Sequence, residues 1–492
     1  MTDVFAILWF DTEDFITPES DDIPRRIALL MSKHRVRVVF KIVGEKLRVL
    51  KKRGRSDVLS ALARHDIGYH SNLHSVHPIM SEYVGNLGWK EGADEFEARE
   101  KSGHDEIKEA FGRVNSFGHP GLSWVPQAYP VLTSWGVGVY LDETFTIETM
   151  NERPFWYGNM LNIMCIRSGV LTLDASGPYN PDGQGLLRIR EQFGNLYRKL
   201  ESQKGEPGVV SVFCHPTTYA TKEFWDVINF SRGRNPREYR KPELKTREET
   251  ERDFERLEEF VVSAKSLPHL HFITAEDALR IYHDRARERK FTGDDLKHLC
   301  ESSLRSITFQ KTPVDEVWVS AAEIFGMVLY SLSRFHISGE LPNSNIEEFV
   351  QPLGPNREAE TTLHGGDQRA EIDAREFLEA CRKEYDLLKV TGYLPHLVRI
   401  NERVELSAAD MFTTCCALYL EIHSGGRPRV ISVHKANFEV GKMVTESGAS
   451  KDWGYYLSPE GFKALEQVKL ARLQTWTLKP ASADLEKLQV PN

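Results

Sequence analysis

Three carboxylates close together near the amino terminus are the first residues whose types and spacing could do chemistry. The segment ILWFDTEDF, residues 7–15, runs from four apolar residues straight into Asp11, Glu13 and Asp14. Acids in this position could simply favour the amino terminus of a following helix, which would account for Glu13 and Asp14. Asp11 directly follows an apparently buried strand, where an unpaired charge is costly. A bound cation would remove that cost.

Two histidines in the segment GYHSNLHSVHP, residues 68–78, have a spacing that suits metal binding. His70 and His74 are four positions apart and follow a predicted strand. In an extended chain their side chains would be about 13 Å apart, at roughly 3.3 Å per residue, whereas a single metal ion needs both ring nitrogens at about 2.0–2.1 Å. The chain must therefore turn at Ser71 and Asn72 or form one helical turn. Together with the acidic cluster, the pair predicts a site for a divalent metal ion.

Two further histidines follow other apolar runs. His215 follows the apolar run GVVSVFC and precedes Pro216, and His119 lies in the Gly- and Pro-rich stretch FGHPGLSW. In parallel α/β sheets and barrels, ligands bind at the carboxyl ends of the strands. We therefore expect both histidines to lie at the same end of one sheet as Asp11, Asp14 and His70.

The elements that must position these residues follow an α/β pattern. Residues 1 to about 290 alternate short apolar runs with helical stretches, which is typical of an α/β fold. The predicted strands are 4–10, 37–43, 66–69, 137–141, 170–173 and 209–214, and the predicted helices are 21–34, 56–64, 90–111 and 254–265. The segment LHFITAEDAL predicts a last strand that enters a helix capped by Thr274 and Asp277.

Length and composition limit the class of protein. A chain of 492 residues is longer than one ordinary domain. The formal net charge of -9 favours neither nucleic acid nor an anionic membrane surface as a partner. We find no apolar run of the roughly 20 residues that span a bilayer and no secretory signal pattern. The six cysteines show no CxxC spacing, so we expect a cytoplasmic protein without a disulfide framework or a thiolate metal site.

The region after about residue 290 has a different, mainly helical pattern. We predict a first domain at 1–288 and a second, mainly helical domain at 289–492 that contains an internal repeat, at about 315–355 and 402–442. VWVSAAEIF, residues 317–325, aligns with VELSAADMF, residues 404–412, and each serine precedes an acid by three positions, which indicates a helix start. Such a duplicated module could bind saccharides or partner proteins, support an oligomer, or cover one face of the first domain.

The order of these motifs resembles the polysaccharide deacetylase family, whose shared domain is named after the chitooligosaccharide deacetylase NodB. HSNLH, residues 70–74, matches the His-(Ser/Thr)-x-x-His motif of this family in full, and WFDTEDF resembles a variant of its acidic first motif. SFGHPGLSW and VFCHP stand where the third and last motifs are expected. The resemblance covers residues 1 to about 285 and implies a distorted (β/α)-barrel of the NodB type.

The resemblance also implies roles for individual residues. Asp11 would be the general base and His215 the general acid. The implied ligands of one divalent metal ion are Asp14, His70 and His74. Glu13 stays the alternative carboxylate ligand, since its longer side chain could compensate for a position closer to Asp11. Zinc is the expected metal, with cobalt and nickel as alternatives.

The third motif departs from the family pattern. The family usually has an arginine there that orients the basic aspartate, whereas this chain has Gly118 and no arginine in residues 115–127. His119 would substitute for it, or the substrate geometry differs. The residues expected to bind substrate are His119, Pro120 and Trp124.

The predicted function is metal-dependent removal of an N-acyl group, most simply acetyl, from an amino sugar of a glycan or glycoconjugate. One alternative keeps the fold and the metal but changes the substrate to a small non-sugar amide or ureide. A second alternative is a glycan-binding protein whose altered third motif reflects lost catalysis.

Overall fold

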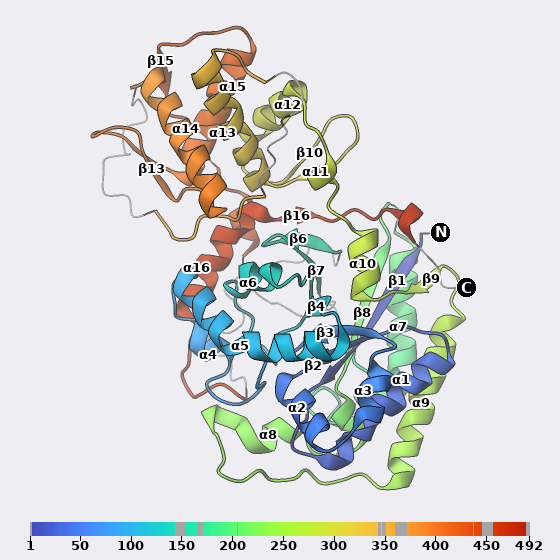
Figure 1. The fold of residues 1–492 in the computed structure, drawn as a ribbon. Helices are drawn as coiled ribbons and strands as arrows, with labels where there is room; N and C mark the ends of the chain where they lie inside the picture. Colours follow the sequence, from blue (N-terminus) through green and yellow to red (C-terminus); the bar gives the residue numbers. More distant parts are fainter. Residues whose placement is uncertain are drawn as a thin grey trace.

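A computed structural model describes residues 2–142, 153–164, 171–203, 205–342, 346, 351–359, 371–435, 437–444 and 456–488. In Figure 1 the lower part holds one large sheet with its helices, and the upper part is a mainly helical region formed after residue 290. This combination confirms the predicted fold class.

The large sheet has ten strands in the order β16-β6-β7-β5-β4-β3-β2-β1-β8, and β9 also pairs with β1. Its strands are β1 (Val4–Thr12), β2 (Val39–Ile42), β3 (Asp66–Tyr69), β4 (Ser116–Phe117), β5 (Val139–Asp142), β6 (Phe155–Tyr157), β7 (Met160–Met164), β8 (Gly208–Cys214), β9 (Leu270–Phe272) and β16 (Lys479–Pro480). Pairing is parallel except where β6 meets β7 and β16. Within the described residues, the edge strands β8 and β16 do not pair, so the predicted barrel is open.

The central strand β1 is covered on both faces of the sheet. All nine of its residues are buried, and its run of Val, Phe, Ile, Leu and Trp is the continuous apolar pattern of a parallel strand covered on both faces. The run predicted at 170–173 differs. Val170 lies outside the described residues, and Thr172 forms only an isolated bridge with Phe213.

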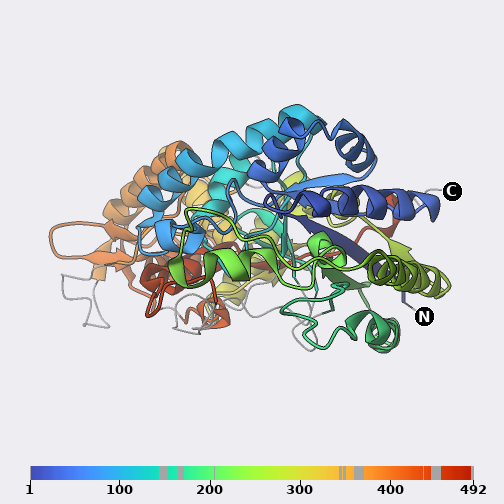
Figure 2. The same cartoon turned by 90° about the horizontal axis from the view of Figure 1, so that it is seen from below.

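Helices cover this sheet, and those at residues 22–33, 56–62, 89–111, 247–265 and 275–281 correspond to predicted helices. The covering helices are α1 (Asp22–Lys33), α2 (Gly44–Lys52), α3 (Ser56–Leu62), α4 (Met80–Val84), α5 (Trp89–Phe111), α6 (Ala128–Ser134), α7 (Gly185–Glu201), α8 (Trp225–Phe230), α9 (Arg247–Lys265) and α10 (Ala275–Ile281). Figure 2 shows the blue helices of the first hundred residues gathered on one side of the sheet. Helix α9 begins earlier than predicted because Thr246 and Glu249 form a capping box. Thr274 and Asp277 cap α10 as predicted.

The helical region contains two similar halves. Its elements are α11 (Arg285–Glu288), α12 (Gly293–Ser303), β10 (Gln310–Lys311), β11 (Trp318–Val319), α13 (Ala321–Ser338), β12 (Glu371–Asp373), α14 (Ala374–Thr391), β13 (Leu397–Arg399), β14 (Glu405–Ser407), α15 (Ala408–His423) and β15 (Val430–Ser432). Ser320 caps α13 and Ser407 caps α15, each after a short hairpin. The equivalent residues Phe325 and Phe412 pack against each other across the two halves, with ring centroids 5.1 Å apart and ring planes tilted by 43°.

The last part of the chain returns to the first region. Helix α16 (Leu465–Gln474) and strand β16 lead back to the sheet, and Val440, Ala471 and Leu478 join the hydrophobic cluster of the first region. The predicted boundary at residue 288 stays a prediction, but Trp476 of this last part packs in the hydrophobic cluster of the helical region. None of the described helices combines the length and the hydrophobicity that a membrane span needs.

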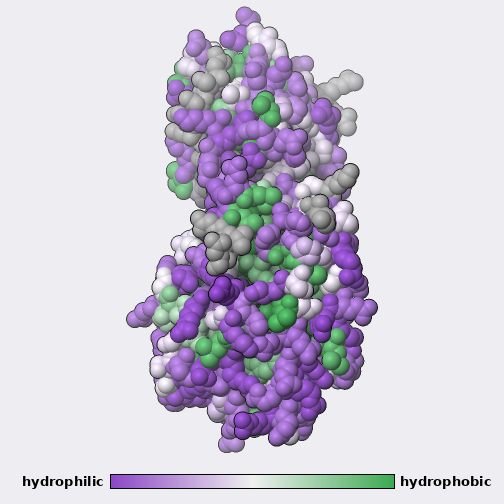
Figure 3. Space-filling view, turned by 90° about the vertical axis from the view of Figure 1, so that its right-hand side faces the viewer, coloured by the Kyte–Doolittle hydropathy of each residue, from purple (hydrophilic) through white to green (hydrophobic). Residues whose placement is uncertain are grey.

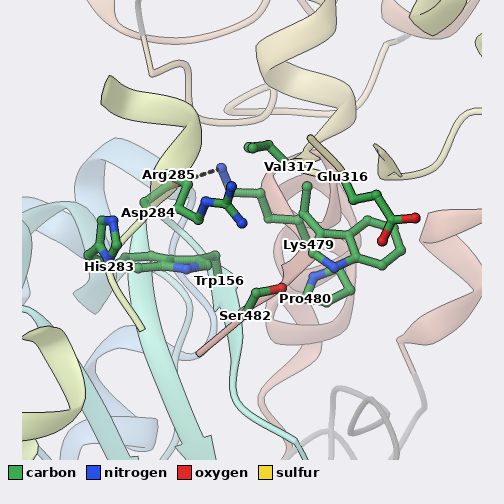
Figure 4. A pocket seen from close by; sticks show the side chains of 10 residues that line it. Trp156, His283, Asp284, Arg285, Glu316, Val317, Lys479, Pro480 and Ser482 are labelled. Atoms are coloured by element: carbon green, nitrogen blue, oxygen red, sulfur yellow. Dashed lines mark hydrogen bonds and ion pairs between the residues drawn. The ribbon is translucent and has the colours of Figure 1, made fainter. Parts of the chain in front are cut away.

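A buried ion cluster joins the two regions. Lys479 Nζ lies 2.7 Å from Asp284 Oδ1 and 2.6 Å from Glu323 Oε1, and all three side chains are buried. Figure 4 shows Lys479 and Asp284 among the residues that line a small pocket at this junction. On the face shown in Figure 3, hydrophobic residues gather near the narrow part of the molecule where the two regions meet, between mostly hydrophilic surfaces.

Replacing Lys479 with methionine should destabilise this junction strongly. The Lys479→Met variant leaves the carboxylates of Asp284 and Glu323 buried without their shared cation, which typically costs about 3–5 kcal/mol. Urea unfolding should report this loss. Lys469→Met is the matched control, because Lys469 is half exposed and pairs with Glu466 on the surface, where a pair contributes about 0–1 kcal/mol. Equal stability of the two variants would contradict this view of the junction.

Candidate metal and active site

The residues singled out from the sequence lie at the carboxyl ends of neighbouring parallel strands. Asp11 lies near the end of β1 and is paired in register with Lys41 of β2. His70 directly follows β3, His119 lies just after β4, and His215 directly follows β8. Because these strands are parallel and adjacent, their carboxyl ends meet at one edge of the sheet, which is where ligands bind in such folds.

Glu13, His70 and His74 form a compact buried cluster with ligand atoms within 4.8 Å of one another. Glu13 Oε2 lies 2.8 Å from His74 Nε2 and 3.4 Å from His70 Nε2. The predicted turn after His70 brings His74 back, with left-handed backbone at Ser71 (φ 67°) and His74 (φ 53°). Non-glycine residues rarely adopt this conformation, and it persists where surrounding contacts enforce it.

Hydrogen bonding fixes how His70 faces this cluster. Its Nδ1 lies 2.8 Å from the carbonyl oxygen of Gly118, which can only accept a hydrogen bond. Nδ1 therefore carries the proton, and in the neutral ring the Nε2 lone pair is directed toward Glu13. Metal-bound histidines in proteins are usually held in this way, by a hydrogen bond from the other ring nitrogen.

His74 has the same arrangement through a longer chain of contacts. Ser75 Oγ donates to Asp226 Oδ2 at 2.9 Å, so its oxygen accepts from His74 Nδ1 at 2.6 Å. Among the described residues, His74 Nε2 has no hydrogen-bond partner, although it lies 2.8 Å from Glu13 Oε2. With Nδ1 protonated, Nε2 carries either a second proton, which pairs with Glu13, or a lone pair, which repels the carboxylate oxygen unless a cation lies near both. The donor set of two imidazoles and one carboxylate suits a divalent metal such as zinc.

The charge state of Glu13 fits the same interpretation. Burial by itself raises the pKa of the Glu13 carboxyl, but without a metal ion the positive charges of His74 and His215 and hydrogen bonds from His70 and His74 outweigh burial and hold the pKa well below its usual range. Trp225 Nε1 donates a hydrogen bond to Glu13 Oε1 at 2.8 Å. Glu13 is therefore an ionised carboxylate whose second oxygen is free to face the histidines.

The geometry favours Glu13 where the sequence interpretation preferred Asp14. Asp14 Oδ1 accepts hydrogen bonds from the backbone N–H groups of Ile16 and Thr17, and its Oδ2 accepts from Thr217 Oγ1 at 2.7 Å. The physical reason is the two-residue period of a strand: Glu13 continues the face of Asp11, whereas Asp14 turns into the loop.

Asp11 is held by a buried lysine. Lys41 Nζ lies 3.0 Å from Asp11 Oδ1 and 3.1 Å from Asp142 Oδ2 of β5. Burial lowers the pKa of Lys41, but the two aspartates outweigh it and raise the pKa above its ordinary value. The sequence interpretation assigned no role to Lys41 or Asp142, because a lysine in an apolar strand and an acid seventy residues beyond His70 carry no motif.

His215 is oriented and charged by a second aspartate that the sequence interpretation missed. Asp174 Oδ2 accepts a hydrogen bond from His215 Nδ1 at 2.9 Å, and Asp174 Oδ1 accepts one from the His215 backbone N–H at 2.6 Å. Burial lowers the pKa of His215, but Asp174, Glu13 and Asp11 outweigh burial and raise it to about 10. His215 Nε2 lies 3.9 Å from Asp11 Oδ2. The available sequence signal was an acid directly after the apolar run 170–173.

The three residues predicted to bind substrate have different positions. His119 lines a small cavity of ≈ 30 Å³ together with Asp11, His70 and His215, and burial lowers the pKa of His119 to about 4. Pro120 lines a neighbouring cavity of ≈ 120 Å³ that also contacts His74. Trp124 is 2% exposed, belongs to the hydrophobic cluster of the first region and lines neither of these two cavities, so its predicted contact with substrate stays a prediction. Its indole N–H donates to Tyr129, so it packs in the core.

Comparison with known proteins finds similarity only among solved structures. No family model matches the chain, and no curated protein matches its sequence. A probable polysaccharide deacetylase from Pseudomonas aeruginosa PAO1 shares 13% identity with a TM-score of 0.37, over 57% of this chain and 90% of that one. An allantoinase shares 13% identity with a TM-score of 0.36, over 57% and 90%. A pseudoenzyme of the CE4 family from Bacillus anthracis shares 18% identity with a TM-score of 0.26, over 44% and 57%.

Polysaccharide deacetylases, the family that the motifs resemble, are thus among the solved structures with a similar chain path. All of these TM-scores are below 0.5, so the activity of this chain has to be argued from the residues of the site itself.

Proposed function

We propose that this chain is a metal-dependent hydrolase that removes an N-acyl group, most simply acetyl, from an amino sugar of a glycan or glycoconjugate. One observation carries the proposal: His70 of the Glu13–His70–His74 cluster lines the same small cavity as Asp11 and His215. Asp11 lies 3.9 Å from both His70 Nε2 and His215 Nε2. A metal site flanked by a carboxylate and a protonated imidazole has the parts that hydrolysis of an amide needs. The sugar as substrate rests on the motif resemblance.

In the proposed reaction, different residues bind the metal ion, accept a proton and donate a proton. Glu13, His70 and His74 would hold the metal ion. When bound, a divalent ion supplies Lewis acidity, which makes water a better nucleophile and polarises a carbonyl oxygen. Asp11 would accept the proton of the attacking water, and His215 would deliver a proton from Nε2 to the departing amine. Asp174 keeps the other ring nitrogen of His215 bonded, so that Nε2 faces the cavity.

The size of the cavity favours a second candidate substrate, a small non-sugar amide or ureide. The cavity next to Asp11 and His215 measures ≈ 30 Å³, whereas one water molecule needs roughly 10–15 Å³ of such space. Only a small group fits inside it, so the leaving amine of a larger substrate would have to extend outward. A small amide would need no such extension.

The proposal predicts metal-dependent release of acetate from N-acetylated amino-sugar oligomers. Purified protein should release acetate from N-acetylglucosamine oligomers, lose this activity on dialysis against a chelator, and regain it on addition of zinc, cobalt or nickel. Acetate measured enzymatically and metal content measured by mass spectrometry would follow both changes. Hydrolysis of allantoin and other small cyclic amides, without acetate release, would favour the second candidate. Activity that survives complete removal of metal would contradict both.

Three other expectations stay predictions. Zinc is the expected native metal, the cytoplasm the expected location, and the helical region the expected surface for any oligomer. The domain boundary at residue 288 also stays a prediction.

A further inference from the structure

The loop after β4 lacks the cation that the motif resemblance leads one to expect. Gly118 stands where the family usually has an arginine, and residues 115–127 contain no arginine at all. The carboxylate of Asp11 nevertheless has a cation beside it. Lys41 Nζ, from the neighbouring strand β2, lies 3.0 Å from Asp11 Oδ1.

Lys41 reaches Asp11 from inside the sheet. Its side chain is 0% exposed, and its neighbours in β2, Phe40 and Ile42, are apolar and buried. A lysine in such a strand is costly unless its charge is paired. The ammonium group has three partners, Asp11, Asp142 Oδ2 at 3.1 Å and the carbonyl oxygen of Leu141 at 3.1 Å. The contacts with Asp142 and Leu141 are hydrogen bonds and the contact with Asp11 is an ion pair, and together they hold the ammonium group in one place.

The glycine at position 118 provides the space for this ammonium group. A Cβ atom at Gly118 would overlap Lys41 Nζ, and it would lie 2.5 Å from Asp142 Oδ2 and 2.8 Å from Lys41 Cδ. A side chain at position 118 and the Lys41 ammonium therefore exclude each other. The Gly118 carbonyl meanwhile accepts the hydrogen bond from His70 Nδ1, so the loop backbone lies close to both groups.

We propose that Lys41 is the positioning residue for Asp11 in this chain. It supplies from strand β2 the cation that an arginine in the loop after β4 would otherwise supply, and Asp142 and Gly118 are the residues that make room for it and hold it. The inference rests on the proposed function, in which Asp11 is the general base. Lys41 acts through Asp11 by keeping its carboxylate directed toward the cavity, and it does not itself contact the reacting atoms.

The test compares Lys41→Met with wild type and with a control. Lys41→Met should lower kcat by about 100-fold or more, the scale on which a positioned base contributes. KM should change less than about threefold, and the metal content should stay at the wild-type value. Lys245→Met is the matched control, because Lys245 forms a buried pair with Asp253 at 2.7 Å and lines neither cavity of the site. The control should lose stability but keep kcat.

A double variant separates positioning from folding. Lys41→Met alone leaves Asp11 and Asp142 buried together, whereas Lys41→Met/Asp142→Asn keeps the net charge of the cluster unchanged and should recover the thermal stability of wild type. If Lys41 positions Asp11, the double variant folds and binds metal but kcat stays low, and a crystal structure shows the Asp11 carboxylate rotated away from His70 and His215. Wild-type kcat in the double variant, or an unmoved Asp11 carboxylate, would overturn the inference. An inactive wild type would instead count against the proposed function, and the position of Asp11 would still decide the inference.

Discussion

Replacing Glu13 with glutamine should remove the metal ion from this protein. The Glu13→Gln side chain keeps its shape and its contact with the indole N–H of Trp225, but it loses the negative charge that faces His70 and His74. A neutral amide is a poor ligand for zinc in place of a carboxylate. We expect the metal content to fall from about one ion per chain to a small fraction of that, with acetate release lost in proportion.

Asp14→Asn is the matched control for Glu13→Gln. Both changes are isosteric, both remove one charge, and the two positions are adjacent. The amide oxygen introduced by Asp14→Asn could still accept the backbone hydrogen bonds from Ile16 and Thr17 that Asp14 Oδ1 accepts. Asp14→Asn should therefore keep its metal. If Asp14→Asn loses the ion and Glu13→Gln retains it, the carboxylate ligand is the one that the sequence interpretation preferred.

Replacing His215 with asparagine should lower kcat by about 10²–10⁴-fold, the range for loss of a general acid. The metal content should not change, because His215 is not one of the three clustered ligand residues. Steady-state kinetics on N-acetylglucosamine oligomers would measure the loss. A substrate with a good leaving group should be affected much less, because such a group needs no proton. Equal losses on both substrates would contradict the role of acid.

Asp174→Asn should move the pH dependence in a defined direction. Asp174 is the largest of the influences that raise the pKa of His215 to about 10, so its charge keeps the imidazole protonated at neutral pH. A general acid loses its proton as the pH rises through its pKa, so activity falls on the alkaline side. Bound metal lowers that pKa through its positive charge, and the alkaline limb of wild type should lie below 10. In Asp174→Asn the limb should shift to still lower pH. An unchanged limb would show that Asp174 does not set the charge of His215.

Much of the local structure could be predicted from the sequence because periodicity and helix caps are local. The strand at 66–69 has the predicted bounds, and α1, α3 and α5 lie within a few residues of the predicted helices. The serines at the starts of the two repeats cap helices as expected. The turn after His70 was required by the spacing of two histidines around one ion, and the backbone makes it at Ser71 and His74.

The pairing of side chains across the sheet could not be predicted in the same way. Asp142 and Asp174 lie far along the chain from Asp11, and no repeating pattern links them. Parallel strands connected by helices bring such residues within hydrogen-bond distance only after the strand order is set. Lys41 shows this most clearly, since it pairs in register with Asp11 through the β1–β2 ladder.

The sequence by itself determined the fold class, most of the elements and the two histidines of the proposed metal site, because hydrophobic periodicity and the reach of imidazole are local properties. Only the tertiary structure placed Glu13 rather than Asp14 beside the two histidines, placed Trp124 in the hydrophobic cluster, and brought Lys41 and Asp174 next to Asp11 and His215. These outcomes depend on which strands are neighbours and on which face each side chain takes. That information exists only once the sheet has formed.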